Sequence, residues 1–221
     1  MDYINKECIY SFFQQLNRDC PAVRYVLIKN INGELPERLK DGKDIDLLVK
    51  EEDREAFAEF MHTHGFQRKT PPLGRKNGWN FAYQLPEYEF WKKLNVNYNF
   101  YIDISFRLCC KSLTPKTWIP LDACINEDLW KQRVWDEKNN WWIMDDETTL
   151  LYLIVRSIFD KREFSEGYIN GIEERLAFLD CERTQRKLRK VFFRYATRLT
   201  EQIRAKNYNG LIEDYLTFTD Y

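Results

Sequence analysis

The sequence predicts an α+β protein, in which a mixed sheet flanked by helices is followed by a C-terminal helical unit. Up to about residue 144, short apolar runs typical of strands alternate with amphipathic segments of helical spacing. From Asp145 onward, apolar residues recur at helical spacing to the end of the chain. We therefore expect an α/β domain over residues 1–144 and a helical domain over residues 145–221.

The first third of the chain follows this alternation closely. Apolar side chains at helical spacing predict the first helix. Turn residues around Gly33 separate the first strand from the second. Acidic residues at 51–53 suit the start of a helix, and Gly65 suits its end. In chain order we expect a helix over 4–16, a strand over 24–28, a helical turn over 35–39, a strand over 44–49 and a helix over 50–65.

The middle third predicts further strands around an exposed loop. Alternating residues indicate strands over 66–69, 79–83 and 97–106. The Pro- and Gly-containing stretch 70–78 predicts a loop, whose Arg75 and Lys76 are candidates to fold over a nucleotide. Residues 111–129 look irregular, residues 133–144 suggest a hairpin, and Asp145 or Asp146 is placed to cap the next helix.

Composition argues against several classes of function. The chain of 221 residues carries 34 basic and 35 acidic residues, a net charge of -1, so bulk charge gives no signal for nucleic-acid binding. No apolar run is long enough to cross a membrane, and the first residues lack the pattern of a secretory signal. Six scattered cysteines without a paired framework favour reduced thiols. We expect a cytoplasmic protein.

Aromatic residues make up 16% of the chain and concentrate between Trp79 and Trp142. Such density suits a stacking platform for a base or a sugar. Packing between a sheet and its covering helices explains it more simply.

Asp44 and Asp46 stand one residue apart in the apolar run 44–49. Side chains on a strand alternate between faces, so both carboxylates point to the same side. Two like charges on a buried strand need a cation or a cluster of donors, and carboxylate oxygens suit Mg²⁺ or Mn²⁺. A divalent metal is the simplest partner, and pairing with Lys or Arg side chains is the alternative.

Asp103 is a third acid within an apolar strand, in Tyr101-Ile102-Asp103-Ile104-Ser105. If this strand lies beside the strand of Asp44, three carboxylates converge on one face. Three acids with open metal positions fit a two-metal site for in-line attack at phosphorus. Ser105 shares the face of Asp103 and is a candidate to line the same pocket.

The order of elements, with the D-x-D strand and the later strand bearing a single Asp, resembles the nucleotidyltransferase superfamily typified by DNA polymerase β and the aminoglycoside nucleotidyltransferases. The resemblance covers about residues 20–107. It implies a nucleotidyltransferase-like mixed sheet, in which Asp44 and Asp46 bind both metals. By the same resemblance Asp103 binds the catalytic metal and helps to activate the acceptor hydroxyl. The run 42–49 is especially similar to small, poorly characterised bacterial members, some found among surface-polysaccharide genes.

The implied activity is a metal-dependent transfer of an NMP from an NTP, such as ATP, to a small hydroxylated or phosphorylated acceptor. The family usually has Gly-Ser after its first strand to hold the triphosphate, whereas this chain has Lys29 and Asn30. A lysine and an amide still bind phosphate oxygens. Lys29, Asn30, Lys43 and Ser105 are therefore the nucleotide-binding candidates.

Two other functions stay open at this point. A glycosyltransferase also uses D-x-D, to hold a metal and a nucleotide-sugar, although it usually has a longer nucleotide-binding half before that motif. A non-catalytic nucleotide-binding module of the same fold would retain the acids without turnover, and the replaced Gly-Ser favours it.

Overall fold

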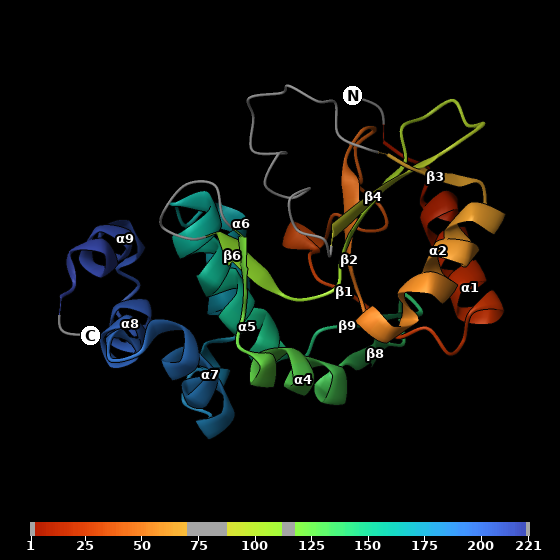
Figure 1. The fold of residues 1–221 in the computed structure, drawn as a ribbon. Coiled ribbons are helices and arrows are strands. Elements are labelled where there is room, and N and C mark those ends of the chain that lie inside the picture. The colour runs from red at the N-terminus through yellow and green to blue at the C-terminus, as the bar shows by residue number, and fades with distance from the viewer. Residues whose placement is uncertain (1–2, 70–87, 112–117, 220–221) are drawn as a thin grey trace. The chain divides into compact units, whose positions relative to one another are not determined.

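The computed structural model describes residues 3–69, 88–111 and 118–219 (Figure 1). Within them the chain divides into two compact units, residues 1–108 with 132–144, and residues 109–131 with 145–221. Arg75, Lys76, the loop expected over 70–78 and the strand expected over 79–83 lie outside the described residues.

The first unit is built on a mixed sheet. Its described strands lie in the order β3-β4-β5-β2-β1-β9-β8, with β2 parallel to β5, β1 parallel to β9, and antiparallel pairs elsewhere. The strands are β1 (Tyr25–Leu27), β2 (Asp44–Val49), β3 (Phe66–Arg68), β4 (Tyr88–Lys93), β5 (Tyr101–Ser105), β8 (Val134–Asp136) and β9 (Trp141–Ile143). The sheet confirms the predicted strands around residues 24–28, 44–49 and 66–69 and the hairpin over 133–144.

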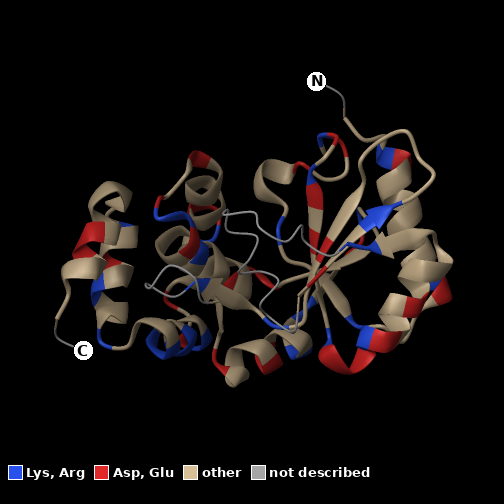
Figure 2. Ribbon diagram, turned by 45° about the horizontal axis from the view of Figure 1, so that its top comes forward, with Lys and Arg blue, Asp and Glu red and all other residues tan. Residues whose placement is uncertain are grey.

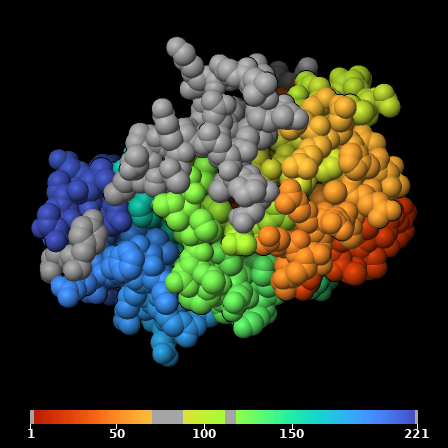
Figure 3. Space-filling view, in the orientation of Figure 1, coloured from red at the N-terminus to blue at the C-terminus, as the bar shows by residue number. Residues whose placement is uncertain are grey.

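Helices α1 (Lys6–Asp19) and α2 (Arg54–Thr63) pack on one face of this sheet, as Figure 1 shows. In the space-filling view of Figure 3 the red N-terminal segment and the orange segment that contains α2 adjoin at the surface. The ring centroids of Phe12 on α1 and Phe60 on α2 lie 6.0 Å apart. Alternate strand residues such as Ile45 and Ile102, exposed by 1% and 0%, complete the core beneath them. Because side chains alternate along a strand, burying this face leaves the acidic residues of β2 and β5 on the other.

The residues that were predicted to mark the ends of helices do so in the structure. Gly65 follows α2 with φ at +71°, a left-handed conformation that glycine adopts without strain. Asp145 caps α5, because its carboxylate accepts a hydrogen bond from the backbone N–H of Thr148 at 3.2 Å. The helical turn expected over residues 35–39 corresponds to a single turn, in which the Arg38 N–H donates to the Glu34 carbonyl at 2.6 Å, and a short 3-10 helix, η1 (Ile31–Gly33), precedes it.

Strand β4 is a feature that the sequence pattern did not predict. Glu89 occupies a buried position of β4, exposed by 3%, which breaks the expected alternation of polar and apolar residues. Its carboxylate accepts hydrogen bonds from Arg54 and from the Trp91 indole, each at 3.0 Å. A buried acid is tolerated there because charged and neutral donors both satisfy it.

The second unit contains mainly helices. Strands β6 (Cys109–Lys111) and β7 (Trp118–Pro120) pair antiparallel beside them. Its described helices are α4 (Ala123–Gln132), α5 (Asp146–Val155), the π-helix η3 (Arg156–Lys161), α6 (Glu166–Glu173), η4 (Leu176–Phe178), α7 (Glu182–Phe192), α8 (Tyr195–Arg204) and α9 (Tyr208–Thr217). The short 3-10 helix η2 (Glu51–Asp53) belongs to the first unit, where it precedes α2.

Residues 109–131, which were expected within the first domain, group with residues 145–221 in the second unit. Residues 111–129 were expected to be irregular, but helix α4 begins within them, at Ala123. The ammonium of Lys187 on α7, exposed by only 2%, lies 2.5 Å from Asp128 on α4 and donates to Thr148 on α5 at 2.8 Å. Such a buried ion pair depends on the tertiary position of each helix. The two units are therefore not separated by a single boundary at residue 144/145, because the segment 109–131 lies before that boundary in the chain but groups with the residues after it.

Charged residues of both signs are interspersed along the helices of each unit (Figure 2). No helix in the described residues is both long enough and apolar enough to span a membrane. The six cysteines are free thiols, and the neighbouring Cys109 and Cys110 are buried.

Candidate functional site

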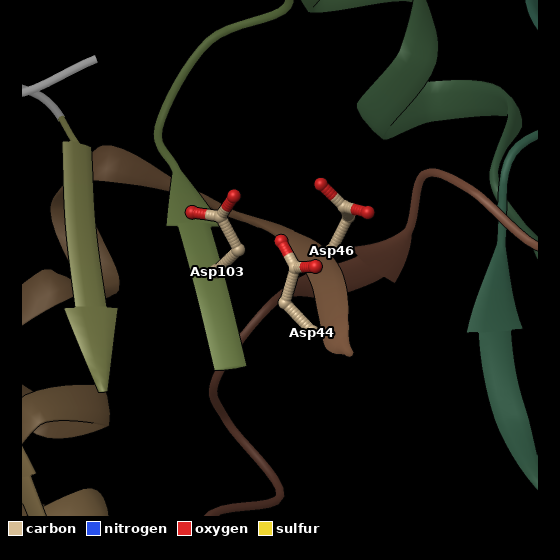
Figure 4. Close-up of side chains that lie close together, drawn as sticks. All are labelled: Asp44, Asp46 and Asp103. Atoms are coloured by element: carbon tan, nitrogen blue, oxygen red, sulfur yellow. The ribbon is translucent and has the colours of Figure 1, made fainter. Parts of the chain in front are cut away.

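Three carboxylates meet on the face of the sheet that α1 and α2 leave uncovered. Strands β2 and β5 are parallel neighbours, and their register places Asp46 directly opposite Asp103. Asp44 lies two residues before Asp46 on the same face, so the three side chains point toward one another (Figure 4). One carboxylate oxygen of each residue lies within 4.8 Å of the others.

The neighbours of these acids in sequence explain why the acids are held in place. Ile45, Leu47, Ile102 and Ile104 point to the opposite face and are exposed by 1% or less. A shift of the pairing register by one residue would bury the carboxylates and expose the isoleucines. The apolar core therefore specifies the position of the triad.

Asp103 lies in the most constrained surroundings of the three. Its Oδ1 is shielded from solvent and has no hydrogen-bond partner among the described residues. Burial, and next the Asp46 carboxylate, raise the pKa of Asp103 well above its usual range, with a smaller contribution from Asp44. The charge of Lys29 and a hydrogen bond with Tyr88 act in the opposite direction. This oxygen needs a cation or a proton.

Lys29 is the candidate nucleotide-binding residue that the fold brings to the triad. It follows β1, the strand beside β2, and its ammonium forms an ion pair with the Asp46 carboxylate. Both side chains are largely buried, with 22% and 16% of their surface exposed. Lys29 compensates one of the three charges, which leaves the pair Asp44 and Asp103 to be balanced.

The other nucleotide-binding candidates have varied surroundings. The amide of Asn30 donates to the backbone carbonyl of Leu35 at 3.3 Å and accepts from its N–H at 2.9 Å, so it supports the turn after β1. The Lys43 ammonium lies 3.8 Å from Glu34, on the surface. Ser105 is half-buried, opposite Leu48 on β2 and Tyr88 on β4, on the face of the triad. Their roles stay predictions.

The turn that leads into β2 is tied to the end of the loop before β5. Gly42 adopts φ at +82°, and its N–H donates to the Asn99 carbonyl at 3.1 Å. The Asn99 N–H in turn donates to the Asp41 carboxylate. These bonds fix where both strands begin, and therefore where Asp44 and Asp103 lie along them.

The residues present fit a divalent metal. Their three carboxylates are hard oxygen donors of the kind that Mg²⁺ and Mn²⁺ prefer. The unpartnered Oδ1 of Asp103 is a ligand atom without another function in the described structure. Within residues 3–69, 88–111 and 118–219, these three form the one group of at least three side chains placed to bind a metal together.

Four further residues share the face of the triad and were not singled out from the sequence. Tyr101 lies opposite Asp44, and β4 places Phe90 opposite Asp103, with Tyr88 and Lys92 on either side. The alternation along β5 indicates the face of Tyr101. Nothing local indicates Phe90, because the pairing of β4 with β5 is a tertiary fact.

Comparison with known proteins finds a structural likeness but no related sequence. No protein-family model matches the sequence, and no curated protein matches it. Among solved structures, the chain is similar to the lincosamide antibiotic adenylyltransferase LnuA in its lincomycin-bound crystal structure, with 10% sequence identity, coverage of 78% of this chain and 96% of that chain, and a TM-score of 0.41.

Proposed function

We propose that the protein is a nucleotidyltransferase that depends on Mg²⁺ or Mn²⁺ and transfers an NMP from an NTP to a small hydroxylated or phosphorylated acceptor. The observation that carries the proposal is the convergence of Asp44, Asp46 and Asp103 within 4.8 Å, with Asp103 Oδ1 buried and unpartnered among the described residues. A stable strand does not need three crowded acids, whereas a metal–phosphate site does.

Asp44, Asp46 and Asp103 would hold the metal. When bound, the cation would neutralise charge on the transferring phosphate and make the attacking hydroxyl more acidic. The acceptor hydroxyl oxygen forms a bond to the α-phosphorus, and the bond from that phosphorus to the pyrophosphate leaving group breaks. The hydroxyl proton passes to a carboxylate of the triad, for which we propose Asp103.

Lys29 supports binding of the donor on the β1 side of the triad. Its ammonium already lies against Asp46, so a triphosphate at the metal would be within reach of the same charge. Such an ammonium replaces part of what the Gly-Ser backbone supplies in the resembled superfamily. We take ATP as the first donor to test, and a role in the cytoplasm in surface-polysaccharide metabolism as the working context.

The test is calorimetry with each NTP in the presence and absence of MgCl₂, together with an assay of pyrophosphate release. We expect NTP binding that requires Mg²⁺ in the wild type and is weakened at least tenfold in Asp44→Asn and Asp46→Asn. Glu51→Gln is the matched control, because Glu51 is a half-exposed surface carboxylate paired with Arg107 at 2.9 Å. Equal NTP affinity in the wild type and both aspartate variants would contradict the proposal.

A second candidate is the non-catalytic nucleotide-binding module. The ion pair between Lys29 and Asp46 favours it, since a lysine that neutralises an acid also reduces the need for a metal. It predicts binding of NTP without release of pyrophosphate under any acceptor. Measured release would exclude this candidate.

The glycosyltransferase alternative receives no support from the sheet. That alternative calls for a parallel, doubly wound sheet before and around the D-x-D strand. Among the described strands, β2 is parallel to β5 but antiparallel to β1, and β4 is antiparallel to β5.

A further inference from the structure

We propose that the ammonium of Lys29 takes the place of one divalent cation at the triad, so that the three carboxylates bind a single metal ion. Three acids by themselves fit a pair of metal ions, which is what the sequence predicts. The inference rests on the proposed nucleotidyltransferase function, and it adds the number of metal ions and the role of Lys29. It follows from the position of the ammonium, the charge of the site and the turn that holds the lysine.

Lys29 occupies the side of the triad where a second metal ion would bind Asp46. Its ammonium forms an ion pair with Oδ1 of Asp46, and both side chains are largely buried. A divalent cation on this side of Asp46 would meet the ammonium at close range, and like charges repel strongly where water is largely excluded. The second oxygen of Asp46 stays available for a metal ion shared with Asp44 and Asp103.

The charge of the site also suits one metal ion. Three ionised carboxylates carry three negative charges, and the Lys29 ammonium compensates one of them. The two charges that remain equal the charge of one Mg²⁺ or Mn²⁺ ion, so a single ion makes the site neutral. The ammonium acts beyond Asp46, because its charge also opposes the rise in the pKa of Asp103.

The ion pair does not by itself satisfy the triad. Oδ1 of Asp103 is shielded from solvent and has no hydrogen-bond partner among the described residues, although Lys29 is already in place. A purely structural pair of Lys29 with Asp46 would leave no reason for two further acids beside it. One more cation is therefore needed, and one is enough.

The backbone on both sides of Lys29 is held in place, which makes its ammonium a fixed part of the site. The N–H of Ile28 donates to the carbonyl of Asp46 at 3.1 Å, so the end of β1 is bonded to the residue with which Lys29 pairs. The Asn30 side chain bonds the N–H and the carbonyl of Leu35 at 2.9 and 3.3 Å, which closes the turn that follows. A lysine stem is flexible, so a fixed cation needs such support.

The test counts the metal ions bound to the protein together with α,β-methylene-ATP, a donor analogue that cannot release pyrophosphate. Equilibrium dialysis, with the analogue at the same concentration on both sides, measures the Mn²⁺ bound per chain, and electron paramagnetic resonance is recorded on the same samples. We expect one Mn²⁺ in the wild type, with the spectrum of an isolated ion. Lys29→Met should bind two, and their coupling at about 3.5–4 Å should broaden the spectrum.

Lys50→Met is the matched control, because Lys50 also forms an ion pair, with Glu52 at 3.0 Å, but on the surface after β2. It should bind one Mn²⁺, and so should Lys29→Arg, which retains the positive charge. The ATP affinity lost in Lys29→Met should recover as MgCl₂ is raised, since a second cation then takes the position of the ammonium. Circular dichroism checks that each variant is folded, and Lys29→Gln replaces Lys29→Met if the latter is not.

Two Mn²⁺ ions in the wild type would overturn the inference, and so would a single ion in a folded Lys29→Met or Lys29→Gln protein. Either result leaves a site that binds metal and nucleotide, so the proposed function would stand without the inference. If the wild type binds neither Mn²⁺ nor the analogue, the proposed function itself fails, and the inference fails with it.

Discussion

Replacing Asp103 by asparagine removes one of three crowded carboxylates while retaining the shape of the side chain. In the metal-free protein we expect Asp103→Asn to raise the free energy of unfolding. The reason is that Asp103 contributes repulsion with Asp46 and Asp44, and its Oδ1 has no partner among the described residues. Residues arranged for a ligand commonly reduce the stability of the free protein.

The size of the effect follows from the geometry. Two unit charges 4.8 Å apart, the outer limit for these oxygens, repel by about 3 kcal/mol at an effective dielectric constant of about 20. Protonation of Asp103 and the charge of Lys29 relieve part of this repulsion. We therefore expect a net gain of about 1–2 kcal/mol, or roughly 2–8 °C in Tm for a chain of this size.

The gain should depend on pH in a defined direction. Because the pKa of Asp103 is raised in the folded state, the folded protein binds this proton more tightly than the unfolded chain. Stability of the metal-free wild type therefore falls as pH rises from the ordinary carboxyl pKa, about 4, through the raised value. Asp103→Asn lacks this fall, so its advantage should be absent near pH 4 and should grow as the pH rises.

Thermal unfolding at pH 8, with EDTA and with a series of MgCl₂ concentrations, tests this reasoning. The wild type should gain stability with Mg²⁺, and Asp103→Asn should gain much less. Glu51→Gln serves again as the control. A metal-free Asp103→Asn protein that is less stable than the wild type, or an equal response of both to Mg²⁺, would refute the account of the triad.

Three further predictions follow. Lys29→Ala should weaken Mg²⁺–ATP binding about tenfold in calorimetry, because its ammonium lies at Asp46, whereas Lys50→Ala, which removes a surface ion pair, should not. Glu89→Ala should lower stability to urea by about 1–3 kcal/mol, because it leaves the buried Trp91 indole N–H without its acceptor; an unchanged stability would be inconsistent with this burial. Lys187→Ala should lower the free energy of unfolding by a similar amount, because it leaves the Asp128 carboxylate without its buried partner. The double variant Lys187→Met/Asp128→Leu should recover most of this loss, and equal instability of the single and double variants would contradict an ion-pair origin.

Much of the first unit was predictable because its signals are local. The alternation in 44–49 and 101–105 showed which residues share a face, and capping residues such as Gly65 and Asp145 marked ends of helices. Strand β4 was missed because Glu89 fills a buried position, and its partner Arg54 is distant in sequence. Helix α4 was missed within residues 111–129, which were expected to be irregular, because the ion pair of its Asp128 with Lys187 joins segments far apart along the chain.

The sequence by itself determined that Asp44 and Asp46 share a face and that Asp103 is an acid within an apolar strand, since both follow from the two-residue repeat of a strand. Only the tertiary structure decided that β5 lies beside β2 in the register that sets Asp103 opposite Asp46. It also placed Lys29 against one carboxylate and Phe90 beside another. Pairing between distant strands depends on burial of the common core, and no local pattern encodes which strands become neighbours.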